Sequence, residues 1–280
     1  MAGAAGSSIA VGSTVAASSV ILTYPLFGGQ ALRYLVGALL LVAMFRTRLP
    51  YIRRSQLPRL LALAATGMVG FNIFLIAALD HASPGAVGAI VGAVPVVLAL
   101  TGPIMRRQLP TPRALAAAVI VSLGAAAVQW AGGGSALGLT LAICAMLCEV
   151  AFSLLALALL PDLGPSGVAT YASLAAAAML VIVALSVEGR GAFRMPTGQE
   201  LAALLYLALV VTAAAFVLWY SSLMRIPVEK AGLFAGLIPI SALISSAAVD
   251  AAHIDFLQVA GVVITGVGVV VGVGQRPSKP

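Results

Sequence analysis

A glycine and proline frame with the spacing Gly-x3-Gly-x2-Pro occurs twice in this sequence, 144 positions apart. Its residues are Gly88, Gly92 and Pro95 in the first copy and Gly232, Gly236 and Pro239 in the second. Both copies lie inside long apolar segments, 84–128 and 228–272. An internal repeat within apolar runs of this length is typical of membrane folds built by duplication. The sequence therefore predicts a duplicated membrane protein.

The composition excludes an ordinary soluble domain. Of the 280 residues, 62% are hydrophobic and 8% are charged, whereas soluble domains have roughly 45–50% and 25%. The lipid bilayer is therefore the expected surrounding. The net charge of +7 is carried by short loops between apolar runs and forms no stripe with interleaved aromatics, so nucleic acid is not an expected partner. These basic residues are interpreted as topology signals.

A membrane-crossing helix needs roughly 20 mainly apolar residues, and the charge, proline and glycine clusters divide the chain into ten such spans. The predicted spans are 5–24, 29–46, 58–79, 84–105, 112–131, 136–159, 166–187, 199–223, 228–250 and 255–274. The expected fold class is an all-α integral membrane protein with ten transmembrane helices as two five-helix repeats. Because five is odd, the second repeat enters the membrane from the opposite side and is inverted.

The predicted domain boundaries follow from these spans. The first repeat covers 1–131, the second, inverted repeat covers 136–274, and 275–280 form a cytoplasmic tail. With the N-terminus in the cytoplasm, 12 of the 15 basic residues fall in inside loops or the tail, and Arg33, Arg190 and Arg194 fall outside. The positive-inside rule therefore favours a model with both termini cytoplasmic.

The chain resembles a known family. The resemblance rests on the pair Arg33-Tyr34 opening the second span, Ala78-Leu79 ending the third, Pro95 inside the fourth and the weak repeat in the second half. These features resemble the EamA-type drug/metabolite transporters over essentially the whole chain, and within them the bacterial exporters of aromatic amino acids. The resemblance implies ten helices in two inverted halves, a substrate cavity between them and location in the bacterial inner membrane.

Glu149 stands near the middle of the sixth span. A carboxylate at that depth costs on the order of 2.5 kcal/mol or more, which marks it as a functional-site candidate. It is expected to bind protons or a substrate ammonium group in the cavity. The alternative is a protonated carboxyl that hydrogen-bonds to a neighbouring helix and holds the bundle together.

Asn72 in the third span and Phe216 in the eighth are equivalent under the repeat, and Phe216 shares a helical face with Trp219 and Tyr220. One amide facing these aromatic groups suits an amphipathic ligand, so all four residues are predicted to line the cavity. Two alternatives stay open. Asn72 can simply bond across helices, and Trp219 can belong to the interfacial aromatic belt.

Pro95 and Pro239 remove backbone donors midway through the fourth and ninth spans, and are predicted to be hinges for opposite gates. Static kinks are the alternative. The glycines of the repeated frame form small-x3-small pairs, which predict tight helix packing at the repeat interface. These packing glycines are Gly88, Gly92, Gly232 and Gly236.

No metal site or cofactor is expected. Cys144 and Cys148 are interpreted as packing residues one helical turn apart. Asp80 with His81, and Asp250 with His253 and Asp255, are interpreted as solvated loop residues. Arg33 is expected to snorkel to the interface, although the resemblance leaves open a role near the cavity mouth.

The spans contain no nucleophile paired with a base, so an enzyme is not expected. A phosphate-binding loop is missing from the sequence, so ATP is not the expected driver. The prediction is a secondary transporter, working as a monomer by alternating access, that exports aromatic or bulky neutral amino acids or similar small amphipathic metabolites. Proton-coupled efflux of cationic drugs, with Glu149 neutralising the cation, is one alternative. An oligomeric channel is the other.

Overall fold

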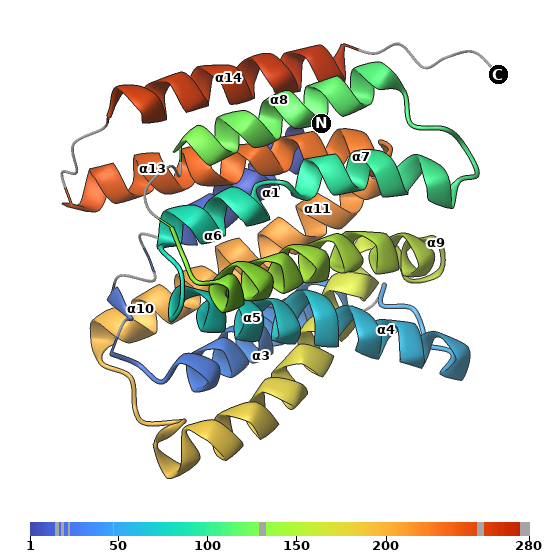
Figure 1. Ribbon diagram of the computed structural model, residues 1–280. Coiled ribbons are helices and arrows are strands. Elements are labelled where there is room, and N and C mark those ends of the chain that lie inside the picture. The colour runs from blue at the N-terminus through green and yellow to red at the C-terminus, as the bar shows by residue number, and fades with distance from the viewer. Residues whose placement is uncertain are drawn as a thin grey trace.

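The computed structural model describes the chain except for residues 15–16, 18–19, 22, 47, 129–132, 251–254 and 275–280. The described residues fold into helices without any strand, and a single isolated antiparallel bridge joins Ala82 to Gly134. The helices run side by side as one bundle (Figure 1). The predicted all-α class is confirmed.

The first half of the chain contains nine of the described elements. The first eight are α1 (Ala2–Gly12), α3 (Leu26–Phe45), the 3-10 turn η1 (Arg54–Gln56), α4 (Leu57–Ala64), the π-helix η2 (Ala65–Gly70), α5 (Phe71–Leu79), α6 (Pro84–Val91) and α7 (Val94–Met105). The helix α8 (Pro112–Val128) follows and completes this half.

The second half begins with the long α9 (Ala136–Val187). The following elements are η3 (Gly189–Gly191), α10 (Gly198–Tyr206), the π-helix η4 (Leu207–Ala214), α11 (Ala215–Leu223), α12 (Val228–Leu233), the 3-10 turn η5 (Phe234–Gly236), α13 (Leu237–Asp250) and α14 (Phe256–Val273).

Seven helices among the described residues are long and apolar enough to cross a membrane. They are Leu26–Phe45, Arg54–Leu79, Pro84–Met105, Ala136–Val187, Gly198–Leu223, Val228–Ser245 and Phe256–Val273. The helix α8, with 17 residues, is slightly shorter. In the most apolar 18 residues of each span, less than half of the residues are buried by the rest of the chain. The buried share is 22% in α14 and at most 44% in the other spans. Apolar side chains left uncovered on this scale call for lipid around the bundle.

The loop predicted between the sixth and seventh spans is reduced to a tight kink between two helices. Within 160–165 only Gly164, with φ 62° and ψ 172°, departs from helical dihedral angles. This left-handed φ suits glycine, and Pro161 and Pro165 weaken the helical hydrogen bonding on both sides. The helix α9 therefore consists of two arms, 136–163 and 165–187, that diverge at this kink.

Element boundaries recur with the 144-residue shift. The span Arg54–Leu79 shifts onto Gly198–Leu223, and both contain a π-helical segment at corresponding positions. The start of α8 at Pro112 shifts onto the start of α14 at Phe256. These last two helices lie side by side at the top of Figure 1. Gly124 and Gly261 permit this approach, because a Cβ on either glycine would lie within 2.9 Å of the other's carbonyl oxygen.

The helix starts are encoded locally. Ser83 and Ser135 cap α6 and α9 by accepting hydrogen bonds from Ala86 N and Gly138 N. Thr197 caps α10 in a reciprocal capping box with Glu200.

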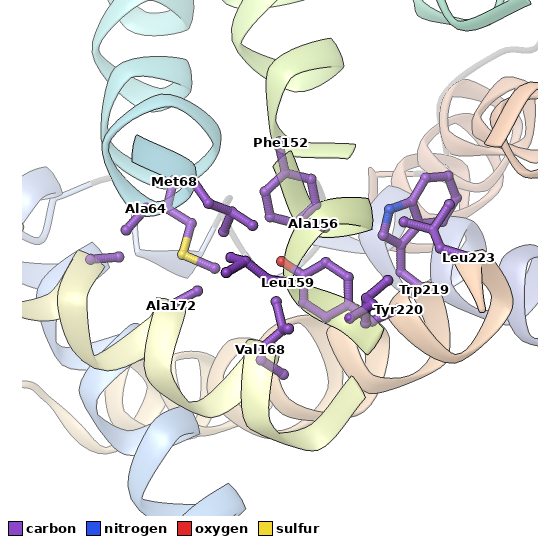
Figure 2. Packing of buried hydrophobic residues seen from close by; sticks show 14 of the residues in the cluster. Ala64, Met68, Phe152, Ala156, Leu159, Val168, Ala172, Trp219, Tyr220 and Leu223 are labelled. Carbon is purple, nitrogen blue, oxygen red and sulfur yellow. The ribbon is translucent and has the colours of Figure 1, made fainter. Parts of the chain in front are cut away.

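The main core lies where both arms of α9 meet α3, α4 and α11, and it contains Met68, Phe152, Leu159 and Tyr220 (Figure 2).

Candidate substrate site

Four aromatic rings meet in this core. Tyr34 of α3 stacks on Phe216 of α11 with ring centroids 6.3 Å apart. Phe152 of α9 lies 5.6 Å from Phe216 and 5.5 Å from Tyr220, and the latter two rings are 6.1 Å apart. This four-ring cluster joins one helix of the first half to two elements of the second. Tilted and offset rings at such distances add about 0.5–1.5 kcal/mol per pair beyond their burial.

The π-helix η2 packs directly on the four-ring cluster. A Cβ added at Gly67 would lie 2.2 Å from Phe152 Cδ2, so a side chain at this position has no room. Met68, the next residue, is fully buried, and Figure 2 places it near Phe152 and Leu159. The cluster is thus covered by the third span as well.

Trp219 is inside the bundle and not in an interfacial belt. Its side chain is 7% exposed and packs with Tyr220 in the main core. A belt position would place the indole N–H at the headgroups, but here Trp219 Nε1 is buried and has no hydrogen-bond partner among the described residues. The belt alternative for Trp219 is therefore wrong, because α11 turns this face towards the core.

Several buried polar atoms in the same region lack partners among the described residues. They are Trp219 Nε1, Tyr220 Oη, Ser153 Oγ, Thr170 Oγ1 and Ser173 Oγ. An unpaired buried polar group costs roughly 1–3 kcal/mol, and most such groups in native proteins are paired. Their concentration on α9 and α11 supplies donors and acceptors that a polar ligand could satisfy.

Glu149 belongs to this region. It lies on α9 one turn before Phe152, is partly buried, and forms no hydrogen bond or ion pair with the described residues. Its carboxyl interacts electrostatically with the hydroxyl of Tyr220. The alternative in which Glu149 holds the bundle through a hydrogen bond to a neighbouring helix has no support in the described contacts.

Asn72 is placed differently from the other predicted cavity residues. Its amide Nδ2 donates to Met68 O, one turn earlier in its own helix. It makes no hydrogen bond to another helix within the part of the chain that the structure describes. Glu149 interacts with Tyr220, which packs with Phe216 and Trp219 in the core. Asn72 instead bonds to its own helix, at a carbonyl of the π-helix η2.

Arg33 does not snorkel to the interface. It is 8% exposed, its Nε donates to Thr212 Oγ1 at 2.8 Å, and its Nη1 donates to Gln30 Oε1 at 3.2 Å. The helix α3 approaches η4 closely here, since a Cβ at Gly37 would lie 2.8 Å from Thr212 Cγ2. The snorkelling expectation is wrong because the second half of the chain covers this side of α3.

Both spans that contain a predicted hinge proline are broken just before that proline. The helix α6 ends at Val91 and α7 starts at Val94, so Pro95 lies in a first turn. In the second half, η5 separates α12 from α13, and Pro239 follows. Proline has no N–H to give and its ring clashes with the carbonyl four residues earlier, so each break precedes its proline.

Three of the four predicted packing glycines have close neighbours on other helices. A Cβ at Gly92 would lie 3.2 Å from the Cβ of Ala125, and one at Gly232 would lie 2.9 Å from Leu98. At Gly236 it would be 2.4 Å from Val121 Cγ1. Gly88 is partly buried. The contacts place α8 against both broken spans and α7 against α12.

One end of the bundle, here the Arg194 end, is closed by a polar network. Arg194 pairs with Glu200, stacks over the ring of Tyr24 at 4.7 Å, and reaches Thr23 O at 3.3 Å. Tyr24 Oη donates to Arg194 O at 2.8 Å. Burial raises the pKa of the Tyr24 phenol, so it remains a donor at neutral pH. Glu188 accepts from the backbone N–H groups that start α3.

The opposite end, here the Arg106 end, has an ion pair and a cavity. Arg106 Nη2 lies 2.6 Å from Glu229 Oε1, joining α7 to α12. Gln56 Nε2 donates to Asp162 Oδ2 at 2.8 Å. The cavity measures about 520 Å³, and its lining comes from the ends of α7 and α11, the first arm of α9 and the start of α12. None of the predicted cavity residues lines it, since they lie deeper in the bundle.

The described residues contain no group of three or more His, Cys, Asp or Glu that could hold a metal ion. Cys144 and Cys148 are free thiols. Asp80 and His81 are exposed. His253 and the tail at 275–280 lie outside the described residues, as does the side chain of Asp250.

Sequence reasoning missed the roles of Tyr34, Phe152 and Arg33 in this region. Tyr34 and Arg33 entered only through the family resemblance and the loop charges. Phe152 follows Glu149 by three residues, which is one helical turn, so a search for aromatic groups beside the intramembrane acid would have found it.

Comparisons with known proteins agree with this architecture. The model of the EamA-like transporter family matches residues 1–130 and again 136–273. The "Uncharacterized transporter YetK" of Bacillus subtilis (strain 168) is 26% identical over 95% of this chain and 85% of its own length. A solved structure described only as "Crystal structure of protein" has a TM-score of 0.81 at 20% identity, over 96% of this chain and 95% of that one, and shows the fold.

Proposed function

Since the chain belongs to the EamA-like transporter family, we propose that this multi-pass membrane protein is a secondary transporter that exports aromatic or other bulky neutral amino acids by alternating access. The observation that carries the proposal is the four-ring cluster with Glu149 in electrostatic reach of Tyr220 and without a hydrogen bond or ion pair to any described residue. An aromatic side chain stacks on such rings, and an ammonium group fits beside the carboxylate.

The proposed arrangement has ten transmembrane helices in two inverted repeats, 1–131 and 136–274, with 275–280 as a cytoplasmic tail. Both termini lie in the cytoplasm and the membrane is the bacterial inner membrane. The recurrence of spans and π-helical segments at the 144-residue shift supports the duplication. The loop charges support the orientation. A monomer suffices, because both halves of the cavity come from one chain.

In this arrangement the Arg194 end faces outwards and the Arg106 end faces the cytoplasm. Substrate enters through the cavity at the Arg106 end and reaches Phe216, Trp219, Tyr220 and Glu149. The polar network at the Arg194 end must open for release. The breaks before Pro95 and Pro239 are the hinges that let the two ends open in turn. Asn72, on the equivalent helix of the first half, contributes its remaining amide groups to the cavity wall.

Proton-coupled efflux of cationic drugs is the second candidate. The free carboxyl of Glu149 favours it, because a carboxylate without a cationic partner neutralises a positively charged substrate as well as it binds a proton.

Reconstitution in liposomes tests the proposal. Radiolabelled phenylalanine counterflow is measured with and without a pH gradient, beside ethidium as a cationic compound. Saturable phenylalanine counterflow is expected, which a channel does not give. Phe216→Ala should lower it, whereas Phe256→Ala, at a ring that is 87% exposed, should not. Transport of ethidium without phenylalanine would replace the proposal by the second candidate.

A further inference from the structure

Arg33 is a buried cation without an anionic partner among the described residues. It forms no ion pair with any described residue, and the one ionisable group among them in electrostatic reach is Tyr34. Both of its hydrogen-bond acceptors, Thr212 Oγ1 and Gln30 Oε1, are neutral. Buried charges in proteins are normally paired or bound to a ligand, because an unpaired one loses its hydration without compensation.

The guanidinium group of Arg33 also has N–H donors that bond to no described residue. It has five N–H donors, and two are used, one on Thr212 and one on Gln30. The others have no described acceptor, so part of the planar fork that binds a carboxylate with two parallel hydrogen bonds is free. The hydrogen bond from Arg33 Nε to Thr212 fixes the orientation of the guanidinium group, because Thr212 is part of the helical segment η4 in the other half.

Arg33 lies beside the four-ring cluster. Its Cζ is 5.1 Å from the centroid of the Tyr34 ring, and Tyr34 stacks on Phe216. Thr212, Phe216 and Tyr220 follow one another at four-residue intervals along η4 and α11. Arg33 binds the first of these residues and Glu149 interacts with the last. The rings therefore lie between a positive group and a negative group.

This order of charges selects a class of ligand. A zwitterion with an apolar body presents a carboxylate, an ammonium and a ring, and matches Arg33, Glu149 and the four-ring cluster in turn. A purely cationic compound gains from Glu149 but is repelled by Arg33, and this repulsion is strong where water is excluded. The pattern thus separates the two candidate substrates of the preceding section.

We propose that Arg33 binds the carboxylate group of the transported substrate. This inference rests on the proposed transport function for its biological meaning, but its test measures binding alone. It assigns the ligand class as carboxylate-bearing amphipathic metabolites, amino acids among them, and disfavours organic cations.

Three compounds test the two charged groups of the ligand separately. Phenylalanine has both groups, 3-phenylpropionate lacks the ammonium, and 2-phenylethylamine lacks the carboxylate. Binding to the full-length detergent-solubilised protein is measured by thermal unfolding and by equilibrium binding of the radiolabelled compounds. Arg33→Met should weaken the binding of both carboxylates by about tenfold or more, the usual range for a lost charge-assisted hydrogen bond. It should tighten the binding of 2-phenylethylamine, because the repelling charge is removed. Arg33→Lys should fall between, since it keeps the charge and loses the fork.

Two controls keep the outcome clear. Arg46→Met removes an exposed arginine and should change nothing. The unliganded Arg33→Met protein should unfold at or above the parental temperature, because an unpaired buried charge is removed. A structural arginine would give the reverse, a lower unfolding temperature and unchanged carboxylate affinity, and would overturn the proposal. Failure of the parental protein to bind either carboxylate would overturn it too.

The outcomes for the two proposals are distinguishable. Carboxylate binding that depends on Arg33 without phenylalanine counterflow leaves this inference standing and removes amino acid export. Counterflow that is unchanged in Arg33→Met leaves export standing and removes this inference.

Discussion

Arg106 and Glu229 form an ion pair of 2.6 Å that joins the end of α7 to the first turn of α12. These two helices belong to the two spans that are broken before a proline. The pair therefore bridges the fourth and ninth spans at the mouth of the cavity, and Arg106 also lines that cavity.

Breaking this ion pair should change the transport cycle more than the stability. The Arg106 side chain is 38% exposed, so the pair contributes at most about 1 kcal/mol. Arg106→Gln should leave the unfolding temperature nearly unchanged. In a background without Cys144 and Cys148, it should increase thiol labelling of a cysteine placed at Leu223, which lines the cavity and is 6% exposed. The exchanged pair Arg106→Glu with Glu229→Arg should restore parental labelling, and Arg59→Gln on the exposed face of α4 serves as the control. Unchanged labelling in Arg106→Gln would mean that the pair does not hold this end closed.

Replacing the two prolines should slow transport. Pro95→Ala and Pro239→Ala restore a backbone donor and favour a continuous helix across each break. Turnover should drop several-fold while substrate affinity changes by less than about twofold, because the cavity walls remain. Pro112→Ala, at the exposed start of α8, is the matched control. The measurement compares the counterflow rate with equilibrium binding, and parental rates in both hinge variants would identify static kinks.

Glu149→Gln should alter transport or its dependence on pH while leaving the fold intact. The amide keeps the shape and removes the charge, and the described structure shows no ion pair or hydrogen bond that the change would break. We expect counterflow to fall by about tenfold or more, which corresponds to about 1.4 kcal/mol, or to lose its response to a pH gradient. Identical flux and an identical pH profile would assign a structural role to the carboxyl.

Gly67 should not tolerate a methyl group. The Cβ of Gly67→Ala would meet the Phe152 ring at 2.2 Å, and overpacking of this kind costs about 1–3 kcal/mol. Gly266→Ala on α14 is the matched control, since nothing lies within 4 Å of its Cβ and alanine favours the helix. Thermal unfolding in detergent should therefore move down for Gly67→Ala and stay level or move up for Gly266→Ala.

Both termini should be cytoplasmic. In a background without Cys144 and Cys148, a single cysteine introduced at Ser278 or at Ala2 should resist a membrane-impermeant thiol reagent in intact cells. One introduced at Arg190 should react, because the Arg194 end faces outwards in the proposed arrangement. A terminus that reacts in intact cells would refute the orientation.

The spans and the repeat could be predicted from the sequence because both depend on local order along the chain. The predicted span 84–105 coincides with the structure, and the predicted spans 58–79 and 199–223 differ from it only at their starts. The kink at Gly164 was harder to predict, since Pro161 and Pro165 are also typical of a loop. The π-helical turns have no sequence signature and arise from packing.

The surroundings of single residues could not be predicted in the same way. The sequence assigned Arg33 to the membrane interface because Arg33 lies near the end of its span. That position is known from one helix alone. Its burial depends on Thr212, which lies 179 positions away and is brought near by the close approach of α3 and η4 at Gly37. The belt alternative for Trp219 arose from the same view of a single helix, and burial of Trp219 in the core excludes it.

The sequence by itself determined that this chain is a duplicated bundle of membrane helices, because apolar length and repeated residues at fixed spacing are sufficient to specify spans in a bilayer. Only the tertiary structure decided that Phe152, Phe216, Tyr220 and Tyr34 share one cluster beside Arg33. That arrangement is set by the rotation and approach of helices far apart in the sequence, and these depend on how the side chains of all the neighbouring helices fill the space between them.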